Sequence, residues 1–114
     1  MIDEILPSEI RVGATKYTMS FEPDIWRKAN GCDGMVDFDT LTIHIVTEDR
    51  PLSDVLNTVL HELLHVCYRE WHIKPRCGEE RTVTALGFAQ ASLYVQNPDL
   101  LHGLQLLTEE VIRG

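Results

Sequence analysis

The residues best suited to chemistry in this chain form the segment His61-Glu62-Leu63-Leu64-His65, which has the pattern H-E-x-x-H. The segment lies within the strongest helical pattern of the sequence, and residues four apart on a helix emerge about 40° apart, one turn along the same face. Two imidazoles placed in this way can bind one zinc ion. Glu62 emerges about 100° from His61, where it can accept a proton from a water molecule whose pKa the ion lowers to about 7. The motif therefore predicts a catalytic zinc centre with His61 and His65 as ligands and Glu62 as general base.

The third ligand has to come from elsewhere in the chain, because a catalytic zinc ion normally has three protein ligands. His72 is the only histidine that closely follows the motif. The spacing from His65 to His72 departs from the H-E-x-x-H-x-x-G-x-x-H pattern of metzincins, and Tyr68 stands where that pattern requires a glycine. Tyr68 and His72 fall near the helical face of His61, where either could donate a hydrogen bond to an oxyanion. The alternative is that Tyr68 and His72 are ordinary exposed residues at the end of a helix.

Two glutamates at the start of the next predicted helix, Glu79 and Glu80, are the other candidates for the third ligand. Glu80 is preferred because Thr84 and Gly87 follow it one and two turns later, and such small residues would let the second helix approach the first. Glu79 shares its face with larger apolar residues and stays the alternative. Both also suit an ordinary role, since acidic residues stabilise the N-terminus of a helix.

Helical periodicity predicts three helices in the second half of the chain. The first has Ser53 as its N-cap, contains the motif, and ends at the breaker Ile73-Lys74-Pro75 after about 19 residues. The other two are expected from Gly78 or Glu79 to Gln96 and from Pro98 to Ile112. The apolar residues of the first helix are expected to pack on the arc opposite the histidines: Leu56, Val59, Leu60, Leu63, Leu64 and Cys67.

The first half of the chain has the patterns of strands. Residues 10–21 alternate in polarity with a phase slip after Gly13, which fits either one bulged strand or a hairpin. A short helical turn is expected from Pro23 to Asn30-Gly31, followed by an antiparallel hairpin of residues 35–38 and 41–46. Residues 1–114 are therefore predicted to form one α+β domain, in which a three-stranded antiparallel sheet packs on the central motif helix, with two further helices.

Composition limits the partners and the compartment. Ten basic and 18 acidic residues give a net charge of −8, which disfavours binding to nucleic acid or to an anionic membrane. The N-terminal residues lack the pattern of a signal peptide and no apolar run is long enough to span a membrane, so we expect a cytoplasmic protein. An odd number of cysteines without a C-x-x-C pair fits reduced thiols at Cys32, Cys67 and Cys77.

The sequence resembles the small zincin-like metallopeptidases of the gluzincin type that phages and prophages encode. The resemblance covers about residues 30–100. It rests on Leu41-Thr42-Ile43-His44-Ile45, Thr58-Val59-Leu60-His61-Glu62-Leu63-Leu64-His65, the run Glu79-Glu80-x-x-Val83-x-x-Leu86-Gly87, and Asn97-Pro98. It implies that His61, His65 and Glu80 or Glu79 bind zinc and that Glu62 is the general base. It also implies that the strand Leu41 to Val46, with Ile43 and Ile45, is an edge strand that aligns an extended peptide substrate. Tyr68 is a further candidate for substrate binding from its position on the helical face of His61.

Three hypotheses follow for the function. The first is a zinc-dependent endopeptidase or amide hydrolase that acts on a peptide or protein substrate. The second is a non-catalytic module of phage or prophage origin that uses the zincin scaffold to hold a partner. The third is a structural helical protein in which the H-E-L-L-H segment has no chemical role.

Overall fold

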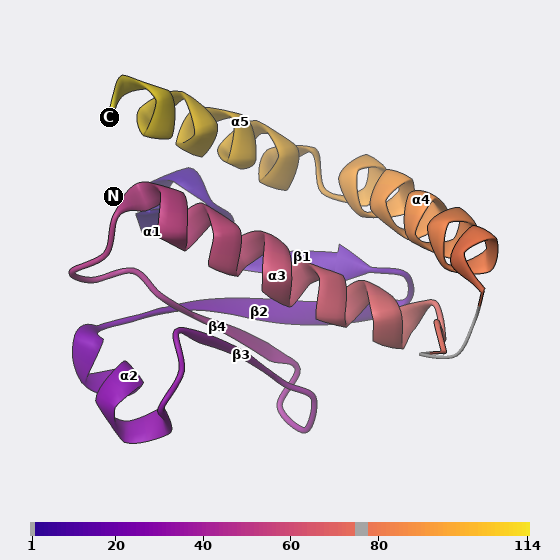
Figure 1. Cartoon of the computed structure of the whole chain (residues 1–114), viewed down its shortest axis with the longest axis horizontal. Helices are drawn as coiled ribbons and strands as arrows, with labels where there is room; N and C mark the ends of the chain where they lie inside the picture. The colour runs from indigo at the N-terminus through magenta and orange to yellow at the C-terminus, as the bar shows by residue number, and fades with distance from the viewer. Residues whose placement is uncertain (1, 75–77) are drawn as a thin grey trace.

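The computed structural model of this protein describes residues 2–74 and 78–114. Within them the chain forms α1 (Ile2–Ile5), β1 (Glu9–Val12), β2 (Thr15–Glu22), α2 (Asp24–Asn30), β3 (Gly34–Asp37), β4 (Thr42–Val46), α3 (Leu52–Glu70), α4 (Glu79–Gln96) and α5 (Pro98–Arg113). Helix α3 runs along the sheet, α4 packs against β1 and α3, and α5 packs against α3 and α1 (Figure 1). The predicted α+β class is confirmed.

Among the described residues the sheet has four strands in the order β1-β2-β4-β3, not the three antiparallel strands that the sequence predicts. Residues 10–21 form the hairpin alternative, because Gly13 takes a φ of +63° in the tight turn between β1 and β2. Strands β2 and β4 are parallel, with Thr18 opposite Thr42 and Glu22 opposite Val46. The chain connects them through α2 and β3, since a parallel pair needs a long crossover connection.

Strand β4 is an interior strand, because it pairs with β2 on one side and with β3 on the other. The expectation that residues 41–46 form the edge of the sheet is therefore wrong. The edges are β1 and β3. Alternation of polarity showed correctly that one face of β4 is buried, but such a pattern does not tell which neighbours a strand has.

Helix α3 packs its buried face on the sheet and on α5. It begins at Leu52, so Ser53 is a helical residue and not the predicted N-cap. The buried arc is also rotated from the expected one: Leu60 and Leu64 are exposed, whereas Glu62 is buried. The core that this face shares with the sheet includes Tyr17, Met19, Ile43, Ile45, Val55, Val59, Leu63 and Val66.

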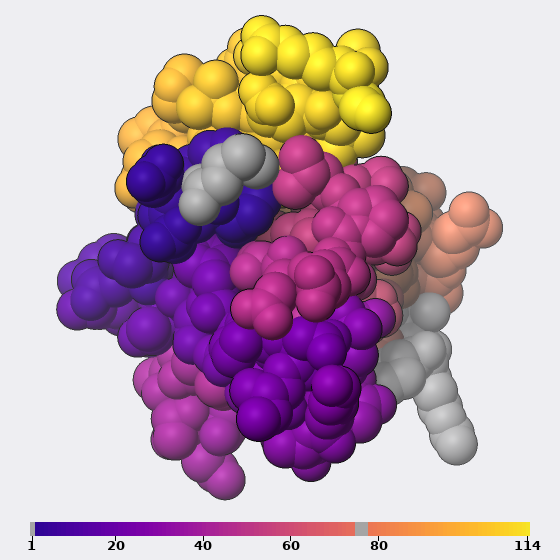
Figure 2. Space-filling view, turned by 90° about the vertical axis from the view of Figure 1, so that its left-hand side faces the viewer, coloured from indigo at the N-terminus to yellow at the C-terminus, as the bar shows by residue number. Residues whose placement is uncertain are grey.

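The two ends of the chain pack together. Helix α1, which the sequence analysis did not predict, lies against α5, and the indigo N-terminal residues touch the yellow C-terminal helix in Figure 2. Gly103 of α5 permits this contact, because a Cβ atom there would lie 2.4 Å from the carbonyl oxygen of Ile5. Helices α4 and α5 have nearly the predicted bounds. None of the helices in the described part of the chain is long and apolar enough to span a membrane.

Side-chain amides cover the outer edge of β1. Asn97, between α4 and α5, accepts a hydrogen bond from the backbone N–H of Arg11 at 2.8 Å and donates to its carbonyl oxygen at 2.6 Å. Gln96 makes the same two-way contact with the backbone of Gly13. These amides satisfy backbone groups that an edge strand would otherwise expose. The other edge, β3, lies beside the H-E-x-x-H segment.

Candidate metal centre

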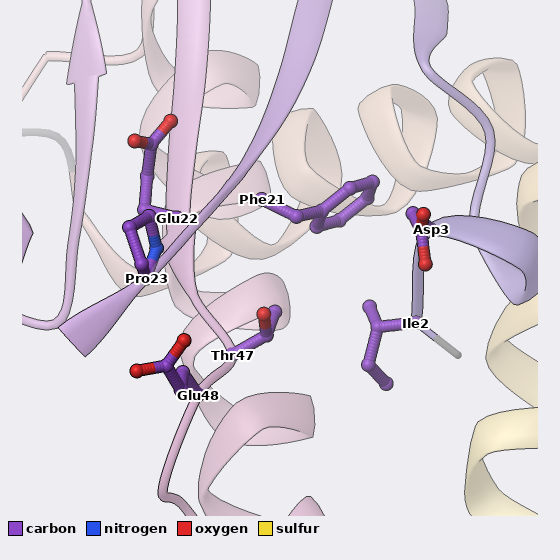
Figure 3. A pocket seen from close by; sticks show the side chains of 7 residues that line it. All are labelled: Ile2, Asp3, Phe21, Glu22, Pro23, Thr47 and Glu48. Carbon is purple, nitrogen blue, oxygen red and sulfur yellow. The ribbon is translucent and has the colours of Figure 1, made fainter.

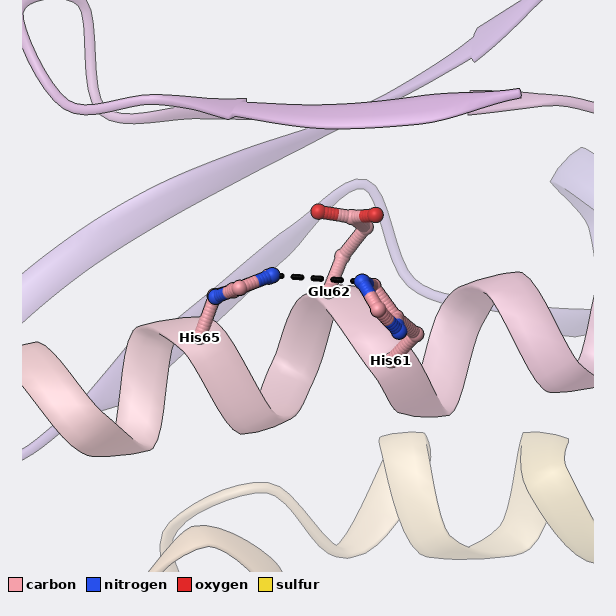
Figure 4. A group of neighbouring side chains, drawn as sticks. All are labelled: His61, Glu62 and His65. Atoms are coloured by element: carbon pink, nitrogen blue, oxygen red, sulfur yellow. Dashed lines mark hydrogen bonds between the residues drawn. The ribbon is translucent and has the colours of Figure 1, made fainter. Parts of the chain in front are cut away.

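His61 and His65 project from the same face of α3, one turn apart. Figure 4 shows both rings and the Glu62 side chain on the side of the helix that faces the strands, away from the pale yellow C-terminal helices. The Nε2 atoms of the two rings lie 3.2 Å apart, and the rings meet edge to face with their centroids 4.8 Å apart. Both side chains are exposed. The helical spacing therefore brings the two imidazole nitrogens together as predicted.

The separation of the two nitrogens fits a shared metal ion. Zinc–nitrogen bonds of about 2.0–2.1 Å to two atoms 3.2 Å apart require an N–Zn–N angle of about 100–106°, close to the tetrahedral value. Without a metal, the same distance places a ring N–H of one histidine against the unprotonated nitrogen of the other. Together with a Glu62 oxygen, the ligand atoms all lie within 4.8 Å of one another, so this group could hold a metal ion.

Glu62 is buried beside the two histidines, with 6 % of its surface exposed. Burial raises the pKa of its carboxyl group above the ordinary value, and the nearby charges of His61 and His65 oppose that shift. No residue in the described ranges forms a hydrogen bond or ion pair with this carboxylate. The site thus contains a largely buried carboxylate that lines the hollow and is uncommitted to other described residues, which is a suitable state for a general base.

Gly34, the first residue of β3, makes room for Glu62. A Cβ atom at this position would lie 2.6 Å from Cγ2 of Thr58 and 3.0 Å from Oε2 of Glu62. Strand β3 can approach α3 this closely only because residue 34 has no side chain. No local sequence pattern indicates this role of Gly34, because the contact depends on the approach of α3.

The backbone of β3 leaves polar groups free at its outer edge. The N–H of Val46 donates to the carbonyl oxygen of Asp33 at 2.9 Å, and partners in an antiparallel pair alternate between bonded and non-bonded positions. The N–H and C=O groups of Gly34 and Val36 therefore point away from β4. A hollow of about 350 Å³ lies here, lined by Gly34, Met35, Val36, Phe38, His61, Glu62 and His65.

A buried arginine fixes the elements around Gly34. The Arg50 guanidinium donates hydrogen bonds to the carbonyl oxygen of Val46 at 2.7 Å and to Oγ1 of Thr58 at 2.8 Å, and it pairs with Asp33 at 3.6 Å. These contacts tie the end of β4, the start of β3 and the first turns of α3 to one group. Thr58 is also the residue whose methyl group packs against Gly34. Arg50 therefore stabilises β3 in its position close to Glu62.

Neither candidate for the third ligand lies with the histidines. The group that could hold a metal consists of His61, Glu62 and His65 among residues 2–74 and 78–114, and it includes neither Glu79 nor Glu80. Glu80 lines a separate hollow with Trp71 and Phe88. Gly87, expected to bring the two helices together, faces open space. Helix α4 instead buries Ala89 and Leu93, which turns the face of Glu80 away from the site.

The residues predicted to bind substrate also lie outside the hollow. Ile43 and Ile45 are fully buried in the interior strand β4, so the prediction that they face a bound peptide is wrong. The physical reason is that both edges of β4 are paired and its apolar side chains pack under α3. Tyr68 is half-buried and is not among the residues that line the hollow. The edge next to the histidines is β3.

A second hollow, of about 390 Å³, is lined by acidic residues but does not form a metal site. Asp3, Glu22 and Glu48 border it together with Phe21, Pro23 and Thr47. Their carboxylates point in different directions in Figure 3 and do not converge on one point. The histidine group on α3 is thus the better metal site in the described part of the chain.

Comparison with protein-family models, with curated proteins and with solved structures found no match to this chain. The functional assignment therefore depends on the geometry of the site and on the sequence resemblance described above.

Proposed function

We propose that this protein is a zinc-dependent hydrolase of peptide or other amide bonds. His61 and His65 are two of the metal ligands and Glu62 is the general base. One observation carries the proposal: two Nε2 atoms 3.2 Å apart lie beside a carboxylate that is buried and forms no bond with other described residues. The resemblance to gluzincins supports the same roles.

The residues of the chain divide the chemistry between them. When bound, a zinc ion polarises a substrate carbonyl group and lowers the pKa of water. Glu62 accepts the proton of the attacking water and later delivers it to the leaving amine. Glu62 lies next to both histidines, where its carboxylate can reach a water bound at the proposed metal.

The open edge of β3 supplies the substrate-binding groups. An extended peptide can add to a sheet edge through main-chain hydrogen bonds. We propose that the free N–H and C=O groups of Gly34 and Val36 make these bonds, which would lay the peptide across the hollow that His61, Glu62 and His65 line. This replaces the earlier expectation for residues 41–46.

The test is the zinc content per chain, measured by elemental analysis of protein purified without a histidine tag, together with cleavage of an unstructured protein. We expect one zinc per chain in the wild type and its loss in His61→Ala. Glu62→Gln should keep the zinc but lose turnover by at least about a hundredfold. His102→Ala, at an exposed position of α5, is the matched control and should change neither quantity. A wild type without zinc, or loss of zinc from Glu62→Gln, would contradict the assigned roles.

The third ligand, Glu80 or Glu79, is proposed from the sequence: from the positions of the two residues on the next helix and from the resemblance. Glu80→Ala and Glu79→Ala, analysed for zinc in the same way, distinguish the two candidates. Loss of zinc in one variant alone identifies the ligand, which would require α4 to adopt a different position in the metal-bound protein. Retention of zinc in both variants rejects both candidates.

One observation favours the alternative of a non-catalytic module that binds a partner through the same scaffold: neither Glu79 nor Glu80 lies with the histidines. Such a module would bind its partner with an affinity that is indifferent to Glu62→Gln, and its zinc-loaded wild type would cleave nothing.

A further inference from the structure

The stripe of α3 that carries the histidines continues to a third polar residue. Arg69 follows His65 by four residues, as His65 follows His61, so it lies one turn further along the same face, about 6 Å along the helix axis. Its side chain is exposed. A positively charged group thus stands beside the proposed metal site of a chain with net charge −8.

Phe38 holds this guanidinium group next to the hollow, although Arg69 itself is not among the residues that line it. The Arg69 carbon Cζ lies 4.5 Å from the centre of the Phe38 ring, and Nη1 donates a hydrogen bond to the Phe38 carbonyl oxygen at 3.4 Å. Phe38 itself lines the hollow with the two histidines. This contact restricts the conformations of the Arg69 side chain and leaves most of its N–H donors available to bond other groups.

Arg69 has no acidic partner in the described part of the chain. Arg27, Arg50 and Arg113 each pair with a carboxylate. The nearby acid Asp37 is on the same hairpin as Phe38, but its carboxylate accepts hydrogen bonds from the backbone N–H groups of Asp39 and Thr40. The charge of Arg69 is therefore available to a ligand.

We infer that Arg69 is a specificity-determining residue that binds a carboxylate of the substrate, either an acidic side chain or the C-terminal carboxylate of a peptide. This inference rests on the proposed function, because it assigns the substrate class of the same site. A guanidinium group binds a carboxylate through two parallel hydrogen bonds, and the Phe38 ring holds it ready to do so. The negative charge of the rest of the chain acts at longer range and is screened beyond about 8 Å at physiological ionic strength.

The experiment uses short alanine-rich peptides in which Glu or Gln stands at each position in turn, each with a free or an amidated C-terminus. The ratio of kcat/KM for the acidic peptide to that for its neutral counterpart is measured with zinc-loaded wild type, Arg69→Met and Arg113→Met. We expect a ratio of about ten in the wild type, as for one solvent-exposed charged hydrogen-bonded pair. The ratio should fall to about one in Arg69→Met and should not change in Arg113→Met, which removes a positive charge far from the site.

Binding of the same peptides, labelled with fluorescein, to the zinc-loaded Glu62→Gln chain gives a readout that needs no turnover. A preference at one internal position assigns an acidic side chain, and a preference confined to the free C-terminus assigns the terminal carboxylate. A wild type without preference, or a preference that Arg69→Met keeps or Arg113→Met also loses, would overturn the inference. Selective binding without any cleavage by the wild type would refute the proposed hydrolysis but support the role of Arg69.

Discussion

Replacing Gly34 by alanine should force β3 away from α3. The new methyl carbon would lie 2.6 Å from Cγ2 of Thr58, about 1 Å inside the usual carbon–carbon contact distance, and 3.1 Å from the carbonyl oxygen of His44. Overpacking of this kind costs about 1–3 kcal/mol, and the loss of glycine flexibility in the unfolded chain returns about 0.4–1 kcal/mol. We expect the variant to be less stable by about 1–2 kcal/mol.

Thermal unfolding of the metal-free protein measures this effect. In a domain of this size, 1 kcal/mol corresponds to about 4 °C, so the Tm of Gly34→Ala should fall by about 4–8 °C. Gly87→Ala is the matched control, because its new methyl group would meet open space within a helix and should raise the Tm by about 2–4 °C. A Gly34→Ala variant as stable as the wild type would refute the close approach of β3.

A second substitution tests whether Thr58 is the colliding residue. Thr58→Ser removes the Cγ2 methyl group but keeps the hydroxyl group that contacts Arg50 and the carbonyl oxygen of Asp54. In the double variant Gly34→Ala/Thr58→Ser, about 1 kcal/mol of the loss should be recovered relative to the sum of the two single effects. Strict additivity would show that the alanine is accommodated in another way.

Three further predictions concern groups away from the site. Burial and the hydrogen bond to Glu70 raise the pKa of Tyr17 above its ordinary value near 10. The folded chain then keeps this proton to higher pH than the unfolded chain, so the contribution of Tyr17 to the free energy of unfolding should be complete below pH 10 and should fall above it. Urea titrations at a series of pH values measure this fall, which should be smaller in Tyr17→Phe. Burial raises the pKa of the Cys67 thiol to about 11. At neutral pH, Ellman's reagent should therefore modify the half-buried Cys32 in the folded chain and Cys67 only after unfolding, and peptide mapping would identify the modified residue. Modification of Cys67 in the folded chain would contradict its burial. Gly103→Ala should lower the free energy of unfolding by about 1–3 kcal/mol, because the methyl group would collide with the backbone of α1; an unchanged midpoint in urea would argue against that packing.

Local sequence patterns predicted the elements of this fold well. The period of the apolar residues indicated α3, α4 and α5, and Asn97-Pro98 marked the break between the last two. Such signals depend on residues close together in the chain, so they are visible without any tertiary contact. Helix α1 was missed because four residues are too few to show a helical period.

The arrangement of the strands could not be predicted in this way. Strand β4 has the same alternation whether its neighbour is antiparallel or parallel, and whether it lies at an edge or inside the sheet. The sequence therefore predicted the antiparallel hairpin of β3 and β4 correctly, but it did not predict that β4 pairs in parallel with β2. The error carried over to the substrate-binding residues, since the peptide was assigned to β4 instead of β3.

The sequence by itself determined the pair His61 and His65 and the position of Glu62 between them, because four-residue spacing on one helix sets the distance between side chains without help from the rest of the chain. Only the tertiary structure decided what surrounds that pair. It buried Glu62 under Gly34, brought Phe38 over Arg69, and left Glu80 on a different face of the molecule. Each of these contacts joins residues from separate elements, and the packing of helices on a sheet, which fixes them, depends on the whole core at once.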